Sequence, residues 1–291
     1  MQQILVVKMH ELLIKSFDEN MVYYKTNTVN KNKCNKCALV FIHGLSGNHT
    51  IWLPIMEHFN ELGYPVIAFD LFGHGNSQTR NKPERFSINS FSRDIQHVLT
   101  KENAKKVILV GYSLGGMIAF EYCRNNPDNV HGIVALSTPP NNPLMYQMTP
   151  VSILAPLLTP IFKSFAFLIG GLASRFKKKK YAYIDYRKLR NYNGMTIILK
   201  DLQGTPASSY LWSFYHMLNY NVLGYADEIN AKVLLISGDI DRIVDKKASM
   251  LLHKKLPNSE INIFEASDHL NPIRRPEKLN KVLEEFIGRL K

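Results

Sequence analysis

Cysteine is scarce in this sequence, and so are long uninterrupted apolar runs. Only three of the 291 residues are cysteines. This excludes a disulfide-scaffolded fold, and the odd number indicates a reducing compartment. No stretch of about twenty residues is wholly apolar and free of proline and charge, which argues against a simple membrane span. The short apolar run at residues 4–7 is followed by no small-residue cleavage site of a signal peptide, so we expect a cytoplasmic protein.

Acidic residues are few relative to basic ones. The chain has 36 lysines and arginines against 24 aspartates and glutamates, a formal net charge of +12. Such a surplus suits nucleic acid or an anionic membrane surface. The basic residues are spread along the chain, however, and no motif of a nucleic-acid-binding module occurs, so we expect no nucleic-acid partner. Charged residues make up 21% and aromatic residues 11% of the chain, which excludes a mainly disordered protein.

Apolar runs typical of strands alternate with segments of helical periodicity along most of the chain. This alternation predicts an α/β fold with a mostly parallel central sheet and flanking helices. We expect strands at residues 4–14, 21–28, 38–42, 65–69, 106–111, 130–136, 232–237 and 260–264. We expect helices at residues 51–62, 90–100, 114–125, 246–256 and 276–290.

The alternation stops between Pro139 and Tyr225. A linker rich in proline and asparagine, residues 139–143, opens this segment, and apolar stretches without strand signals follow. We interpret it as a helical insertion that lies on the sheet domain. Pro156 and Pro160 are expected to break any single helix over residues 151–173.

A G-x-S-x-G motif carries the strongest chemical signal. Gly111-Tyr112-Ser113-Leu114-Gly115 follows an apolar strand and precedes a helix. In this context the serine is forced into a strained turn and presents its hydroxyl above the sheet. The flanking glycines relieve clashes that a side chain would cause. Ser113 is therefore a candidate nucleophile.

A serine nucleophile needs a base, and the base needs a carboxylate that orients it. Asp239 and Asp241 directly follow one predicted strand, and Asp268 and His269 follow the next one. The carboxyl ends of parallel strands form the edge at which open α/β sheets place their sites. The chain order is therefore serine, aspartate, histidine, with the choice of aspartate still open.

With these motifs the chain resembles the α/β-hydrolase fold family over about residues 20–290. The motifs are HGLSG at residues 43–47, DLFGHGNS at 70–77, GYSLG at 111–115, GDID at 238–241, and His269. The resemblance implies a serine hydrolase with a helical cap, similar to monoacylglycerol lipases and carboxylesterases. It divides the chain into a hydrolase core, residues 1–138 and 226–291, and a cap insertion, residues 139–225.

The resemblance also assigns roles to the candidate residues. Ser113 becomes the nucleophile, His269 the base and Asp241 the acid, because the family places the acid three residues after Gly238. Asp239 remains the competing acid, and the side chain of Asp268 is expected to point elsewhere.

Two backbone N–H groups are expected to form the oxyanion hole. By resemblance these belong to Leu45, in the loop after the first parallel strand, and to Leu114, directly after the nucleophile. His43 is expected to hold that loop by hydrogen bonds, His74 to be structural, and Asp70 to anchor the loop that follows it.

The expected substrate is a small-molecule acyl ester of medium or long chain, cleaved without a metal or organic cofactor. The carbon–carbon bond hydrolases of the same fold use the same three residues and are the alternative. The apolar cap segment is interpreted either as a packed cap core or as an acyl-binding lid that rests on a lipid surface. The basic run Lys177, Lys178, Lys179 and Lys180 favours peripheral contact with an anionic membrane.

Overall fold

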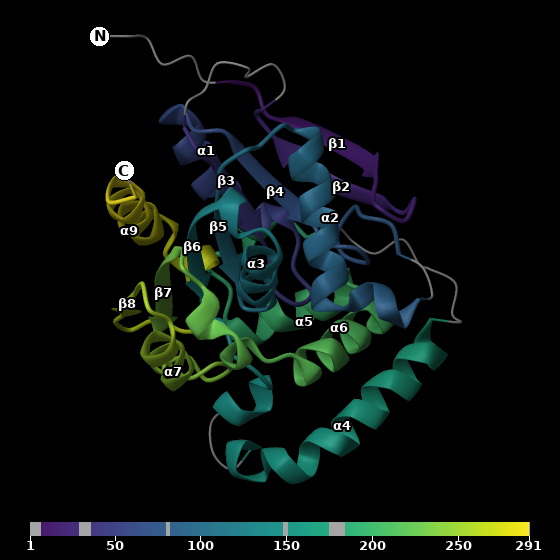
Figure 1. The fold of residues 1–291 in the computed structure, drawn as a ribbon. Coiled ribbons are helices and arrows are strands. Elements are labelled where there is room, and N and C mark those ends of the chain that lie inside the picture. Colours follow the sequence, from purple (N-terminus) through teal and green to yellow (C-terminus); the bar gives the residue numbers. More distant parts are fainter. Residues whose placement is uncertain (1–6, 29–35, 80–81, 148–150, 175–183, 291) are drawn as a thin grey trace.

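The predicted strands assemble into one sheet of eight strands in a computed structural model of the protein (Figure 1). The structure describes residues 7–28, 36–79, 82–147, 151–174 and 184–290. The order of strands across the sheet is β1-β2-β4-β3-β5-β6-β7-β8. The strands are β1 (His10–Lys15), β2 (Met21–Thr26), β3 (Ala38–Ile42), β4 (Val66–Asp70), β5 (Val107–Tyr112), β6 (Val130–Leu136), β7 (Lys232–Gly238) and β8 (Ser259–Phe264).

The first two strands are antiparallel, and the remaining strands pair in parallel. β1 pairs with β2 and β2 with β4 in antiparallel register, whereas β3 to β8 form the parallel part. Glu19 turns the chain between β1 and β2 in the left-handed conformation, with φ of 66°. The prediction of a mostly parallel α/β sheet is therefore confirmed, and the parallel strands end at one common edge.

Helices cover both faces of this sheet (Figure 1). In β3, Val40 and Ile42 belong to one apolar core, and Leu39 and Phe41 belong to the other. An uninterrupted apolar run is typical of a strand that is buried on both faces in this way. The helices around the sheet are α1 (Leu53–Glu61), α2 (Ile88–Lys101), α3 (Leu114–Asn125), α7 (Lys247–Lys255), α8 (Asn271–Arg274) and α9 (Pro276–Gly288).

Element boundaries differ from the sequence prediction by a few residues. β1 begins at His10, later than expected, and residues 4–6 of that predicted strand lie outside the described residues. Helix α2 is capped by Ser87, whose side chain accepts a hydrogen bond from the backbone N–H of Ser90. The predicted helix at residues 51–62 begins with a turn of 3-10 helix, η1 (His49–Trp52).

In the described part of the segment between β6 and β7, three further α-helices lie beyond the carboxyl edge of the sheet (Figure 1). These are α4 (Val151–Ala173), α5 (Gly194–Gly204) and α6 (Ala207–Asn219). The sequence predicted a helical insertion in this segment but gave no bounds for its separate helices. The basic run from Lys177 to Lys180 falls outside the described residues.

The expectation that two prolines break the α4 segment is wrong. Pro156 and Pro160 both lie inside one continuous helix. Each proline removes a single backbone hydrogen bond, and a helix of this length tolerates that loss as a local distortion. Both proline rings are exposed on the outer side of α4, where they displace no packed neighbour.

Helix α3 approaches the sheet most closely at Gly115. A Cβ added to Gly115 would lie 2.2 Å from the carbonyl oxygen of Ile42 at the end of β3 and 2.8 Å from that of His43. No side chain fits this space, so only glycine allows the first turn of α3 to lie against the end of β3. Because Ser113 immediately precedes α3, the same contact sets its position relative to the loop after β3.

We expect Gly115→Ala to lower the free energy of unfolding by about 1–3 kcal/mol, because the added methyl group forces α3 away from the strand end. Urea denaturation measures this difference. Gly171→Ala in α4 is the matched control, since nothing lies within 4 Å of the Cβ position there. That variant should be neutral or slightly more stable. Equal stability of the two variants would contradict the packing argument.

Candidate active site

Ser113 occupies the tight turn between β5 and α3. Its backbone has φ of 53° and ψ of −112°, a conformation that residues other than glycine rarely adopt. A Cβ on Gly111 would lie 2.3 Å from the carbonyl oxygen of Gly115, so the flanking glycines are required as the motif predicts. The result is a strand–turn–helix elbow that directs the serine hydroxyl into a cavity beyond the sheet edge.

His269 and Asp241 meet at the same edge, from the loops that follow β8 and β7. Nδ1 of His269 lies 2.8 Å from Oδ2 of Asp241, and both side chains are buried. The backbone N–H groups of Ile243 and Val244 each donate to Oδ1 of Asp241 at 2.9 Å. Burial alone raises the pKa of Asp241, but the charge and hydrogen bond of His269 hold it below its usual value.

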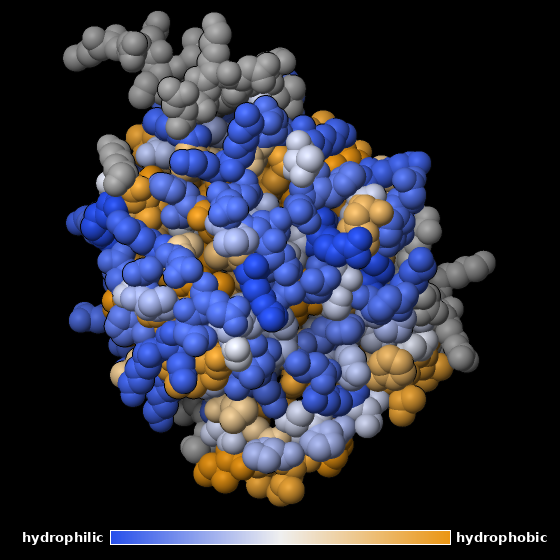
Figure 2. Space-filling view, viewed as in Figure 1, coloured by the Kyte–Doolittle hydropathy of each residue, from blue (hydrophilic) through white to orange (hydrophobic). Residues whose placement is uncertain are grey.

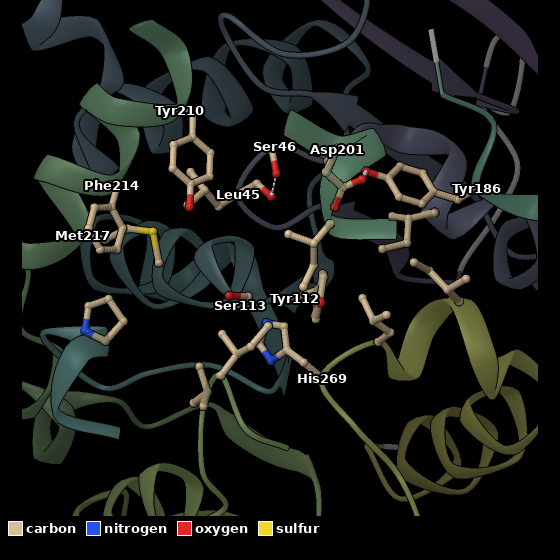
Figure 3. Close-up of a pocket in the computed structure, with 18 of the residues that line it drawn as sticks. Leu45, Ser46, Tyr112, Ser113, Tyr186, Asp201, Tyr210, Phe214, Met217 and His269 are labelled. Atoms are coloured by element: carbon tan, nitrogen blue, oxygen red, sulfur yellow. Dashed lines mark hydrogen bonds between the residues drawn. The ribbon is translucent and has the colours of Figure 1, made fainter. Parts of the chain in front are cut away.

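This pairing leaves Nε2 of His269 as the ring nitrogen available for proton transfer. His269 and Ser113 both line the same cavity (Figure 3). The Tyr112 ring supports the imidazole, with ring centroids 5.1 Å apart. Sequence analysis noted Tyr112 only as the variable position of the motif and missed this contact.

The competing acids point away from His269. Asp239 accepts a hydrogen bond from the backbone N–H of Ser267 at 3.1 Å. Asp268 lies 3.5 Å from Arg274 and accepts from the backbone N–H of Leu270 at 3.0 Å. The structure therefore brings Asp241, rather than Asp239 or Asp268, to the imidazole.

The loop after β3 is fixed by His43. Nε2 of His43 accepts a hydrogen bond from the backbone N–H of Leu71, so Nδ1 carries the proton and donates to the carbonyl oxygen of Gly44. Burial lowers the pKa of His43 to about 4, which keeps the ring neutral near pH 7. Leu45 follows in this loop and lines the cavity with Ser113. Leu114 is the first residue of α3 and directly follows Ser113 in the chain.

A buried carboxylate holds the neighbouring loop. Asp70 accepts hydrogen bonds from the backbone N–H groups of His49 and Asn76, both at 2.7 Å, and from the His49 ring at 2.8 Å. This is the anchoring role expected of Asp70, although sequence analysis missed His49. His74 is also buried, and its Nδ1 lies 3.1 Å from the carbonyl oxygen of Phe72. Burial lowers the pKa of His74 to about 3, which suits a structural role.

The cavity that contains Ser113 lies between the sheet edge and the cap, and its lining is mostly apolar (Figure 3). Tyr210, Phe214 and Met217 of α6 line one side. Asp201 of α5 and Tyr186 line another, and the Tyr186 hydroxyl donates to Oδ1 of Asp201. Sequence reasoning missed these two residues because no motif marks them and their positions depend on how the cap folds.

The order of the strands and the strand–turn–helix elbow at Ser113 are those of an alpha/beta hydrolase fold. The chain belongs to the alpha/beta hydrolase fold family, whose family model matches residues 38–276.

Known relatives agree with this assignment. The chain is similar to Protein ABHD8 of Mus musculus, with 26% identity over 260 residues that cover 86% of this chain and 55% of the relative. It therefore spans about half the length of that relative. It is also similar to putative esterase/lipase 1 of Mycoplasma genitalium, with 26% identity over 254 residues covering 85% of this chain and 90% of the relative. A thermophilic esterase from Thermogutta terrifontis shares the fold, with a TM-score of 0.73, 17% identity, and coverage of 97% of this chain and 99% of that one.

We expect Ser113→Ala to lower kcat for hydrolysis of p-nitrophenyl butyrate by about 10⁴-fold or more, because the attacking oxygen is removed. Steady-state rates measure the loss. Ser174→Ala, at the end of α4 and outside the cavity lining, is the matched control and should keep wild-type activity. Wild-type turnover by Ser113→Ala would refute the role of Ser113.

Proposed function

We propose that the protein hydrolyses carboxylic esters of medium- or long-chain acyl groups, monoacylglycerols among them, through an acyl-enzyme on Ser113. The observation that carries this proposal is a strained, buried serine that lines a mostly apolar cavity. The ionised Asp241 beside His269 supports it, because this pair matches the needs of serine activation.

In the proposed reaction, Nε2 of His269 takes the hydroxyl proton as Oγ of Ser113 attacks the ester carbonyl carbon. The carbonyl double bond opens, and the oxygen becomes an oxyanion. His269 then gives its proton to the departing alcohol, and the acyl group remains on Ser113. Water, deprotonated by His269, then attacks the acyl carbon, the bond between that carbon and Oγ breaks, and His269 returns the proton to Oγ as the acid leaves. Asp241 orients the imidazole and stabilises its cation throughout.

Backbone N–H groups of Leu45 and Leu114 are proposed to bind the oxyanion. Leu114 begins α3, so the positive end of the helix dipole also faces the developing charge. Hydrogen bonds of His43 hold the loop after β3, and those of Asp70 hold the loop after β4, before substrate binds. Donors that are fixed in advance need not reorganise in the transition state.

The cavity lining favours an apolar acyl group. Phe214 and Met217 of the cap, with Ile243 and Ile273 from the core, present hydrocarbon surface near the serine. Each buried methylene group of an acyl chain contributes about 0.8 kcal/mol to binding. A longer chain therefore gains affinity here up to the length that the cavity accepts.

The carbon–carbon bond hydrolases of the fold remain the alternative, but the lining favours esters. Substrates of those enzymes carry carboxylates, which are usually bound by arginine or lysine. None of the described residues that line the cavity is an arginine or a lysine. Arg187 pairs with Asp185 at 2.9 Å and Arg190 with Glu277 at 2.6 Å, both outside this lining.

A series of p-nitrophenyl esters from acetate to palmitate tests the proposal. We expect kcat/KM to rise from acetate toward the longer chains, by up to roughly fourfold for each methylene group buried. Ser113→Ala, measured in parallel, should abolish this activity.

Activity confined to acetate and butyrate would contradict a long-chain substrate and make the cap a packing element. Hydrolysis of a dienoate diketone, with no activity on any ester, would instead establish the carbon–carbon bond hydrolase.

A further inference from the structure

Helix α4 packs on the protein through its smallest side chains. Its buried residues are Ala155, Ala166 and Gly170. A Cβ added to Gly170 would lie 2.7 Å from the ring nitrogen of Trp212 in α6, so the two helices are in close contact. A surface helix of a soluble protein normally buries its large apolar side chains instead. In α4 this arrangement is reversed.

The large apolar side chains of α4 point outward. Ile153 and Leu157 are each 71% exposed, and Leu168 is 68% exposed. Figure 2 shows apolar surface at the lower edge of the molecule, where Figure 1 places α4. The outward residues are Ile153, Leu154, Leu157, Ile161, Phe162, Phe165, Leu168, Ile169 and Leu172, whereas the ring of Phe167 lies against that of Tyr215 in α6.

This apolar surface extends along a helix of 23 residues. At about 1.5 Å per residue the helix is roughly 35 Å long. Soluble monomers seldom expose a contiguous apolar patch of more than a few hundred Å². By length and composition α4 is also able to cross a membrane. To cross a membrane, however, α4 would have to separate from α6, and the other side of α6 lines the cavity that contains Ser113. The observed packing therefore suits a helix that lies along a membrane surface.

The chemistry of the outward side favours lipid over a protein partner. The polar side chains there are few: Ser164 is exposed and Lys163 is half-buried. Protein interfaces pair apolar area with hydrogen bonds, whereas acyl chains require none. Helices that face lipid typically turn small residues toward a neighbouring helix and large apolar residues outward, as α4 does. The net charge of +12 is complementary to anionic headgroups.

We propose that α4 lies along the surface of an anionic lipid layer and inserts its outward side chains among the acyl chains. Binding of α4 to a lipid layer requires no catalytic step, so it is independent of the proposed ester hydrolysis.

Docking through α4 would also bring lipid close to the catalytic cavity. Phe214 of α6 packs against a small cluster that contains Ala155 of α4 and Leu144, and the same Phe214 lines the cavity. One layer of side chains therefore separates the proposed lipid contact from the cavity. This step of the inference rests on the proposed hydrolysis of acyl esters.

Flotation with phosphatidylcholine vesicles, with and without phosphatidylglycerol, tests the docking. The combined variant Leu157→Asn, Ile161→Asn and Leu168→Asn should bind anionic vesicles at least roughly tenfold more weakly than wild type, because it removes buried apolar area. The control variant Leu13→Asn and Met250→Asn changes exposed apolar residues outside the cap and should bind like wild type. All three proteins should hydrolyse soluble p-nitrophenyl butyrate equally, which verifies folding independently.

Absence of vesicle binding, equal binding to neutral and anionic vesicles, or equal binding of the α4 variant would overturn the proposal. Self-association of wild type that the α4 variant loses, without vesicle binding, would show that a second copy covers α4. Loss of esterase activity with retained vesicle binding would refute only the proposed function.

A separate observation concerns the polar pair in the cavity. Tyr186, in the 3-10 helix η5 (Tyr186–Leu189), donates its hydroxyl hydrogen bond to Asp201 of α5. Tyr186 is buried, and burial raises the pKa of Asp201 to about 7. A carboxyl group has about four acceptor positions, and Tyr186 occupies one of them. A carboxyl group held in a largely apolar lining is costly unless other donors reach it.

We infer that Asp201 and Tyr186 bind a hydroxyl group of the alcohol part of the substrate, as a glyceryl ester would offer. The acyl group takes the apolar side near Phe214 and Met217, which leaves the polar side for the alcohol (Figure 3). This inference rests on the proposed ester hydrolysis and names a substrate class for it.

The test compares kcat/KM for monooleoylglycerol with that for methyl oleate, which has the same acyl chain and no hydroxyl group. Asp201→Leu should lower the ratio of the two values by roughly tenfold or more, since a hydrogen bond to a carboxylate is lost. Asp201→Asn keeps an acceptor oxygen and should restore most of the ratio. Equal losses on both esters would overturn the inference, whereas wild type that cleaves neither ester would refute the proposed function itself.

Discussion

The close backbone contact between α3 and the end of β3 is the constraint on which the site depends. Gly115 lies so near the carbonyl oxygen of Ile42 that no side chain fits between them. This contact forces Ser113 into its left-handed turn and sets the serine beside the loop that carries Leu45. Parallel pairing of β5, β6, β7 and β8 then places the loops of Asp241 and His269 at the same edge.

Buried polar groups keep these loops from moving. His43 uses both ring nitrogens, one as acceptor and one as donor, and its low pKa keeps the pattern unchanged near neutral pH. Asp70 accepts hydrogen bonds from the backbone N–H groups of His49 and Asn76, which belong to two separate segments. In a low-dielectric interior such bonds are strong, and breaking one leaves an expensive unpaired group. A strained conformation such as that of Ser113 persists only where the surrounding structure holds it in place.

The core of the fold and the residues at the sheet edge could be predicted because both follow from local sequence. Apolar runs mark the strands, and candidates such as Ser113 and His269 follow strand ends at short distances. The cap could not be predicted in this way. α4 stays continuous through Pro156 because the outward position of the ring costs no packing, and Asp201 reaches the cavity only through the fold of the cap. Tertiary packing determines both the continuity of α4 and the position of Asp201, and no short sequence motif predicts that packing.

Helix α6 contacts the cavity on one side and helix α4 on the other. Phe214 and Met217 face the cavity, while Trp212 meets the glycine of α4. Side chains that line the cavity must therefore fit both the substrate and the helix outside it. Because α4 contributes mainly small residues to this contact, most of its large apolar residues remain exposed. The exposed apolar surface of α4 thus follows from how closely α4 packs on α6. Its apolar side chains suit the acyl chains of the proposed lipid layer, as the cavity lining suits the proposed acyl substrate.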